Sequence, residues 1–150
     1  PVLYSIIFVI LCYLIMNKTK MGRYIYAVGG NPEAARFSGI NIKRVKFFAY
    51  TFSGFMAGFA GIVLASRMFS GQPTAGVAAE LDAIAAVVLG GTSMTGGYGR
   101  IGGTVIGALI IGVLSNGLNL IGVSSFWQYI VKGIVILIAV YADVIKRKAA

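Results

Sequence analysis

Long uncharged apolar runs, separated by short polar stretches, dominate the hydrophobic pattern of the chain. Residues 47–66 ("FFAYTFSGFMAGFAGIVLAS"), 101–122 ("IGGTVIGALIIGVLSNGLNLIG") and 2–16 carry no charge, and residues 126–142 form a slightly short run that contains Lys132. A helix of about 20 residues rises about 30 Å, which is the thickness of the hydrocarbon core of a bilayer. The pattern therefore predicts a membrane-spanning helix in each of these four segments.

A fifth apolar run, residues 81–99 ("LDAIAAVVLGGTSMTGGYG"), is too short to cross a bilayer as one helix. Its uncharged core from Ala83 to Gly91 would rise only about 13 Å. The remainder would cross as glycine-rich backbone, which is tolerated at membrane depth only where protein or a watery cavity surrounds it. Transporters build their pathways from such broken helices. The segment therefore predicts either a short broken passage along a transport route or an extracellular re-entrant hairpin.

The basic residues orient these segments in the membrane. Residues 17–46 contain seven of the 13 basic residues and one acid, Glu33, and residues 146–148 read "KRK". Positive charge marks cytoplasmic loops, so both stretches are expected in the cytoplasm. Three long spans separate residues 17–46 from residues 146–148, and three crossings would leave the two stretches on opposite faces of the membrane. Residues 81–99 must therefore cross as well, so that the number of crossings is even. The expected fold is an all-α polytopic transmembrane helix bundle with about five membrane passages.

The composition supports a membrane protein and excludes two other classes. The chain is 58% hydrophobic and 11% charged, which is not typical of a soluble domain of 150 residues. The formal net charge of +9 is bunched between apolar runs, so it indicates membrane orientation and no nucleic-acid partner. The chain begins inside an apolar run, without a methionine or the features of a signal peptide. Residues 1–150 are therefore expected to be the later part of a longer transmembrane domain that contacts lipid.

The basic stretch contains "NPEAARFSG", which carries the end signals of one short helix. Asn31 is a good N-cap, Pro32 suits the first helical position, and the charge of Glu33 favours the positive end of the helix dipole. Gly39 lies where a left-handed C-cap is expected. The segment therefore predicts a helix that ends at Ser38.

A helix this short is marginal in water, so it is expected to dock against a partner. Ala34, Ala35 and Phe37 offer a small apolar surface for a groove, and Arg36 offers a charge for an acidic rim. The alternative is a solvated loop beside the membrane that touches anionic lipid headgroups. The residues alone leave both interpretations open.

Charged side chains near the apolar segments allow structural and functional interpretations. Glu80 and Asp82 lie at the start of the short helix, where they either cap it or, for Asp82, line a pathway. Lys132 lies within an apolar run about 9 Å along the helix from Phe126, so its side chain is expected to snorkel to the outer surface.

Five uncharged polar residues are further candidates for a translocation path. The glycine-rich stretch contributes Thr92 and Ser93. One long helix contributes Ser115, Asn116 and Asn119, for which hydrogen bonds between helices and contact with a substrate are the two interpretations.

Glycine patterns predict close helix packing and no chemistry. "GYGRIG" at 97–102 matches G-x-G-x-x-G, but it lacks the acid about 20 residues later that a dinucleotide site needs. The chain has no phosphate loop, no histidine and no pattern typical of a metal site or a nucleophile, so neither catalysis nor a cofactor is expected on it. Small residues at four-residue spacing mark helix faces that approach closely. These pairs are Gly54 with Gly58, Gly103 with Gly107, and Ala108 with Gly112.

Two long stretches resemble a known family. Residues 26–62 ("YAVGGNPEAARFSGINIKRVKFFAYTFSGFMAGFAGI") and 81–140, which begin "LDAIAAVVLGGTSMTGGYGRIGG", are similar to the C-terminal half of permease subunits of sugar importers of the ATP-binding cassette (ABC) type. The ribose permeases are the nearest type, within a group shared with the branched-chain amino-acid permeases.

The resemblance implies a type II importer architecture of about ten helices, in which residues 81–99 are the short eighth crossing. It implies a second permease chain, a periplasmic sugar-binding protein, and cytoplasmic ATPase subunits that bind ATP and magnesium. The helix from Asn31 to Gly39 matches the coupling helix that docks into the ATPase. The expected function is import of a ribose-like monosaccharide across the bacterial inner membrane, with residues 17–46 and the C-terminus in the cytoplasm. The alternatives are a self-contained channel or secondary transporter, and a branched-chain amino-acid permease.

Overall fold

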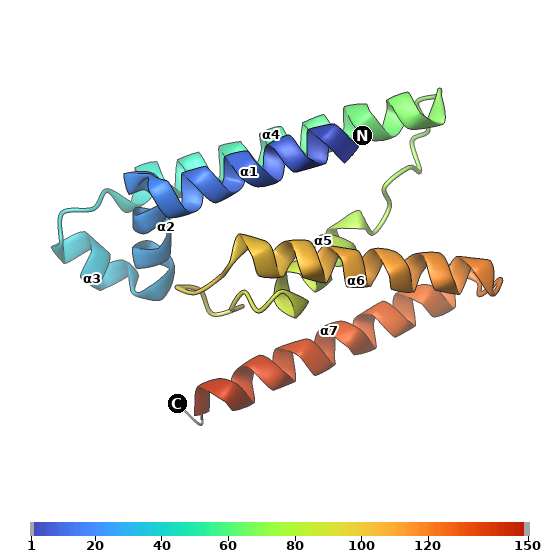
Figure 1. Ribbon diagram of the computed structural model, residues 1–150. Helices are drawn as coiled ribbons and strands as arrows, with labels where there is room; N and C mark the ends of the chain where they lie inside the picture. The colour runs from blue at the N-terminus through green and yellow to red at the C-terminus, as the bar shows by residue number, and fades with distance from the viewer. Residues whose placement is uncertain (1, 149–150) are drawn as a thin grey trace. The chain divides into compact units, whose positions relative to one another are not determined.

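Figure 1 shows the computed structural model of the chain, which describes residues 2–148 apart from the side chains of Asp143 and residues 146–148. The described residues form helices joined by turns, without a strand, so the all-α prediction is confirmed. The chain divides into two compact units, one up to Val77 and one that begins at Ala78. Each unit has its own buried core.

The first unit consists of helices α1 (Val2–Lys18), α2 (Lys20–Gly30), α3 (Pro32–Phe37) and α4 (Ile42–Met68). The second consists of α5 (Ala79–Leu89), α6 (Ile101–Leu120) and α7 (Ser125–Lys148). Within the described residues, α4, α6 and the part of α7 up to Ala142 are long and apolar enough to cross a membrane, and α1 reaches that length together with α2. The four predicted spans therefore correspond to α1, α4, α6 and α7.

Helix α2 was not predicted, and it changes the description of the basic stretch. The chain bends by 73° at Thr19, between the end of α1 and the start of α2. The Thr19 hydroxyl donates to the Ile15 carbonyl at 2.6 Å and accepts a hydrogen bond from the Gly22 amide at 3.3 Å. Gly22 lies against the backbone carbonyls of Ile15 and Met16, where any side chain would collide. The bend is therefore a fixed corner that a threonine and a glycine make possible.

Helices α1 and α4 lie side by side in the first unit (Figure 1), where Phe59 of α4 contacts two aromatic rings of α1. The ring centroid of Phe59 is 4.6 Å from that of Phe8 and 6.0 Å from that of Tyr4, both in edge arrangements. Such pairs add about 0.5–1.5 kcal/mol to the burial of the rings. These ring contacts connect α1 to α4.

Glycines form the close contact between α5 and α6 in the second unit. Gly103 lies against the backbone of Gly90, and one turn further along α6 Gly107 lies against the carbonyl of Ala86. The two helices are therefore antiparallel, and the predicted close packing at Gly103 and Gly107 is confirmed. Gly54, Gly58 and Gly112 meet open space among the described residues.

The core of the second unit forms where α7 joins this pair. Ala85 is fully buried, and Ala86 and Ile111 are buried beside it. Val135 and Ile136 of α7 pack against this cluster. After Leu120 the chain turns at Gly122, whose φ of +76° favours glycine, and α7 runs back and away from α6 (Figure 1).

The glycine-rich residues 90–99 do not continue the path of α5. The Ser93 amide donates to the Tyr98 carbonyl at 3.0 Å, and the Gly96 amide donates to the Ser93 carbonyl at 3.3 Å, so the segment turns back on itself before α6 begins. Helix α5 has 11 residues and rises about 16 Å, about half the rise of α6. Backbone hydrogen bonds therefore close residues 90–99 into a turn that joins the antiparallel helices α5 and α6. The passage of residues 81–99 across the membrane stays a prediction.

Candidate functional site

The first candidate site is α3, whose ends follow the predicted capping pattern. Asn31 Oδ1 accepts a hydrogen bond from the Ala34 amide at 3.0 Å, and Pro32 occupies the first turn. The helix ends at Phe37, one residue earlier than predicted, because Ser38 serves as the C-cap with its amide donating to the Ala34 carbonyl at 3.0 Å. Gly39 follows with a φ of +80°. The predicted short helix is confirmed, with both ends satisfied by local hydrogen bonds.

Helix α3 is anchored to the rest of its unit through Ala35. This side chain is 4% exposed and packs with Val28 of α2 and Val45 of α4, which are 7% and 4% exposed. The expectation that Ala35 belongs to an outward docking surface is therefore wrong. A six-residue helix needs a buried face to be stable, and among its residues Ala35 supplies that face.

The outward face of α3 carries an exposed aromatic ring between charges. Phe37 is 89% exposed, and Glu33, Ala34 and Arg36 are exposed beside it. The support of Ala35 by α2 and α4 removes the argument that the helix needs an external partner to fold. The same packing holds the backbone of α3 in place, so less conformational entropy is lost when Phe37 binds to a groove.

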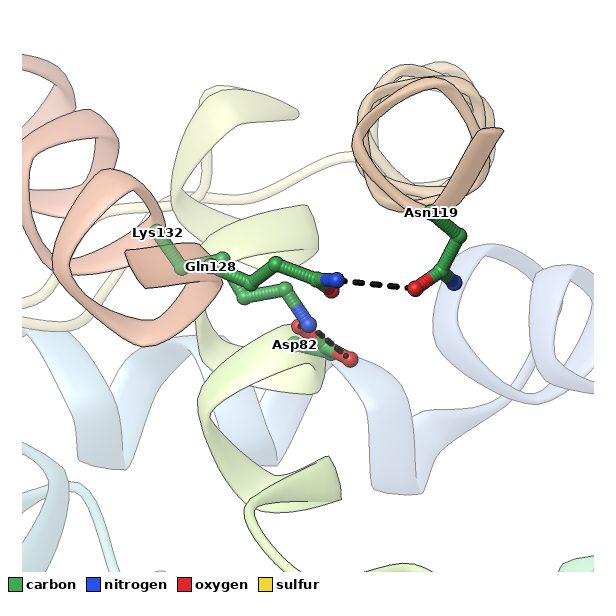
Figure 2. Close-up of polar contacts among 4 residues, drawn as sticks. All are labelled: Asp82, Asn119, Gln128 and Lys132. Carbon is green, nitrogen blue, oxygen red and sulfur yellow. Dashed lines mark hydrogen bonds and ion pairs between the residues drawn. The ribbon is translucent and has the colours of Figure 1, made fainter. Parts of the chain in front are cut away.

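The second candidate site is a polar cluster among α5, α6 and α7 (Figure 2). Lys132 Nζ donates a hydrogen bond to Asp82 Oδ2 at 2.9 Å and lies 2.6 Å from Oδ1. Lys132 is 7% exposed, so the prediction that it snorkels to the outer surface is wrong. The nearby carboxylate on α5 gives the ammonium group an opposite charge inside the unit, and it pairs there instead.

Asp82 does not cap α5, and its role in a translocation path stays a prediction. Helix α5 begins at Ala79 without a side-chain cap, and the Asp82 carboxylate is directed to Lys132 (Figure 2). The Asp82 side chain remains 38% exposed, whereas that of Lys132 is 9% exposed. The ammonium group of Lys132 therefore lies close to both carboxylate oxygens, of which Oδ1 is buried.

Gln128 lies one helical turn before Lys132 and joins α7 to the end of α6. Its Nε2 donates to Asn119 Oδ1 at 2.8 Å and to the Val123 carbonyl at 2.9 Å, and the residue is 8% exposed. The interpretation of Asn119 as a polar contact between helices is confirmed. Gln128 was missed by the sequence analysis, although its four-residue spacing from Lys132 places both on one face of α7.

The other path candidates do not gather at this cluster. Ser115 has a buried hydroxyl without a hydrogen-bond partner among the described residues, and Asn116 is exposed. Thr92 and Ser93 lie beyond the opposite end of α5, where the Ser93 hydroxyl is 3.0 Å from that of Thr95. The structure therefore pairs Asp82 with Lys132 and Asn119 with Gln128, one turn apart on α7, and places the glycine-rich candidates elsewhere.

Comparison with known proteins decides the family. The family model described as the permease component of branched-chain amino acid transport systems matches residues 2–140. The chain belongs to this permease family. It is therefore a multi-pass helical membrane protein, as the spans α1, α4, α6 and α7 indicated.

About half of the residues are identical between the chain and the aligned parts of its curated relatives. It is 55% identical over 150 residues to the ribose import permease protein RbsC of Bacillus subtilis, and 58% identical over 139 residues, 93% of the chain, to RbsC of Escherichia coli K12. It is 47% identical over 148 residues to the xylose transport system permease protein XylH of Haemophilus influenzae. The chain covers 46%, 43% and 40% of the lengths of these relatives. No solved structure matches the chain significantly.

Proposed function

We propose that the chain belongs to the permease subunit of an ABC importer that moves a ribose-like monosaccharide across the bacterial inner membrane into the cytoplasm. The observation that carries this proposal is the identity of 47–58% to permeases whose names specify import of ribose or transport of xylose. ATP hydrolysis takes place on a separate ATPase subunit. A second permease chain and a periplasmic sugar-binding protein complete the importer.

The α3 helix supports an ATPase partner. Its exposed face presents Phe37 with Glu33 and Arg36, while Ala35 ties the helix to α2 and α4. A movement of the ATPase groove that holds Phe37 passes through this tie into the long helix α4. Residues 17–46 and the C-terminus then lie in the cytoplasm, and the Asp82 carboxylate and Asn119 face the route of the sugar.

Cross-linking from a cysteine on α3 tests this function. The full chain carries Ala34→Cys with Cys12→Ala, and the matched control carries Thr74→Cys, which is exposed and lies beyond the other end of α4. We expect the Ala34→Cys chain to capture a nucleotide-binding subunit in native membranes and the control to capture none. Capture of no nucleotide-binding subunit at Ala34→Cys, with and without ATP, would overturn the docking proposal.

Transport of branched-chain amino acids is the second candidate, because the family description names this substrate class. Uptake of labelled ribose and labelled leucine by cells with the full permease as their sole importer of that type separates the two. We expect uptake of ribose, inhibited by excess pentose and dependent on the ATPase subunit. Uptake of leucine alone favours the second candidate, and ribose uptake that persists without any ATPase indicates a self-contained channel or secondary transporter.

A further inference from the structure

A bend of 73° separates the directions of α1 and α2. Helix α1 has 17 residues, carries no charge before Lys18 and rises about 25 Å, which is close to the thickness of the hydrocarbon core, so α1 by itself is taken as the span. Membrane-spanning helices tilt on average by about 20° from the bilayer normal. A helix that leaves such a span at 73° runs close to the membrane surface, at the depth of the lipid headgroups.

The two faces of α2 differ sharply. Met21, Ile25 and Val28 pack inward in the core that α2 shares with α3 and α4. Lys20 and Arg23 lie on the opposite face and are exposed, with spacing that keeps them adjacent on the helix. The apolar face is therefore occupied within the protein, and the face left free is basic.

Further cations surround this face in the first unit. All of the basic side chains from the end of α1 to the first turns of α4 are exposed, and none forms an ion pair with a carboxylate among the described residues. Glu33 on α3 is the single acid between residues 2 and 77. The exposed cations at the ends of α1, α2 and α4 are Lys18, Lys20, Arg23, Lys43, Arg44 and Lys46.

We propose that Lys18, Lys20 and Arg23, together with Lys43, Arg44 and Lys46, form a binding surface for the headgroups of anionic phospholipids; this set is called the α2 basic surface. Lys18 ends an apolar helix, so its ammonium group lies where the hydrocarbon meets the headgroups. Clusters of lysine and arginine directly beside a membrane span attract anionic lipid. This proposal depends on the membrane position of α1 and not on the identity of the transported solute.

An acidic rim on the ATPase is the other occupant that the charge would fit. The geometry favours lipid, because Lys18, Lys20 and Arg23 lie at the corner where the apolar helix α1 ends. The exposed ring that suits a protein groove is on α3 instead. Lipid bound at the corner would hold the core that α2 shares with α3 and α4 at the membrane surface.

Headgroup-specific fluorescence quenching tests this proposal. The full chain, with Cys12→Ala and a fluorophore on Ala27→Cys of α2, is reconstituted with its partners in phosphatidylcholine vesicles. One set of vesicles contains spin-labelled phosphatidylglycerol, and a comparison set contains spin-labelled phosphatidylcholine. We expect markedly stronger quenching by phosphatidylglycerol, and Lys20→Gln with Arg23→Gln to reduce this preference by at least about fivefold. The control pair Arg67→Gln with Arg100→Gln removes the same charge elsewhere and leaves the preference unchanged.

Three results would overturn the proposal: equal quenching by both lipids, a preference that survives the Lys20 and Arg23 substitutions, or a preference that survives molar salt. The salt titration measures the lipid preference of the chain that keeps Lys20 and Arg23, so its result is valid even if a variant fails to assemble. A variant that keeps its lipid preference but loses capture of the ATPase subunit would assign the surface to that protein instead.

Discussion

The ion pair between Asp82 and Lys132 predicts strong energetic coupling between α5 and α7. The perturbations are Asp82→Asn, Lys132→Met and the double variant that carries both. Removal of the carboxylate leaves a buried ammonium group without its partner, whereas removal of both charges leaves none uncompensated. We therefore expect the double variant to be more stable than the sum of the single effects predicts.

The structure sets the size of the effect. Lys132 is 7% exposed in an apolar helix, where an unpaired charge costs up to about 3 kcal/mol. The Asp82 side chain is 38% exposed, which weakens the attraction, and polar contacts between membrane helices reach about 1.7 kcal/mol at most. We expect Asp82→Asn to lower the free energy of unfolding by about 1–3 kcal/mol, with about 1–1.5 kcal/mol of coupling between the two positions.

Unfolding of the full chain by sodium dodecyl sulfate in bicelles measures these free energies. Glu80→Gln is the matched control, because Glu80 is exposed on the same helix, and we expect it to change stability by less than about 0.5 kcal/mol. Strict additivity of Asp82→Asn and Lys132→Met would refute the reasoning. A control effect as large as that of Asp82→Asn would show that charge in general, and not this pair, matters.

Three further substitutions, one of them with a matched control, have expected outcomes. Gly107→Val places a side chain against the carbonyl of Ala86 and should lower the free energy of unfolding by about 1–3 kcal/mol in the same assay. The control Gly112→Val places its side chain in open space and should be well tolerated. Equal losses of stability would contradict the α5–α6 contact. Phe37→Ala should weaken capture of the ATPase subunit about tenfold without changing the stability of the permease, and a loss of stability instead would make Phe37 a packing residue. Gln128→Leu removes one hydrogen bond to Asn119 of α6 and one to the Val123 carbonyl in the turn, and it should lower the free energy of unfolding by about 1–2 kcal/mol. Thermal unfolding in detergent measures this change, and an unchanged stability would show that these bonds contribute nothing.

Local signals in the sequence predicted the long apolar helices and the capped helix α3. Apolar run length identifies a span, and Asn31 and Gly39 mark helix ends because their contacts lie within a few residues. The glycine spacing on α6 predicted a close approach, although it did not identify Gly90 as the partner of Gly103. In each case the deciding contact is local or repeats along one helix.

Tertiary contacts decide the features that the sequence did not predict. Helix α2 contains glycine at 22, 29 and 30 and mixes basic with apolar residues, so its pattern is weak, and its stability depends on packing of Val28 with Val45. The same core turns Ala35 inward. Lys132 pairs with a residue 50 positions away, and no local pattern distinguishes this pairing from snorkelling.

Accessibility of single cysteines to a membrane-impermeant thiol reagent tests the central claim most directly. The claim is that α3, with the basic stretch around it, and the C-terminal end of α7 share the cytoplasmic face, while the turn between α6 and α7 lies outside. In intact spheroplasts we expect Ser124→Cys to react, and Lys43→Cys and Lys146→Cys to be protected until the membrane is opened, all in a chain with Cys12→Ala. Reaction of Lys43→Cys and Lys146→Cys from opposite faces would contradict the account.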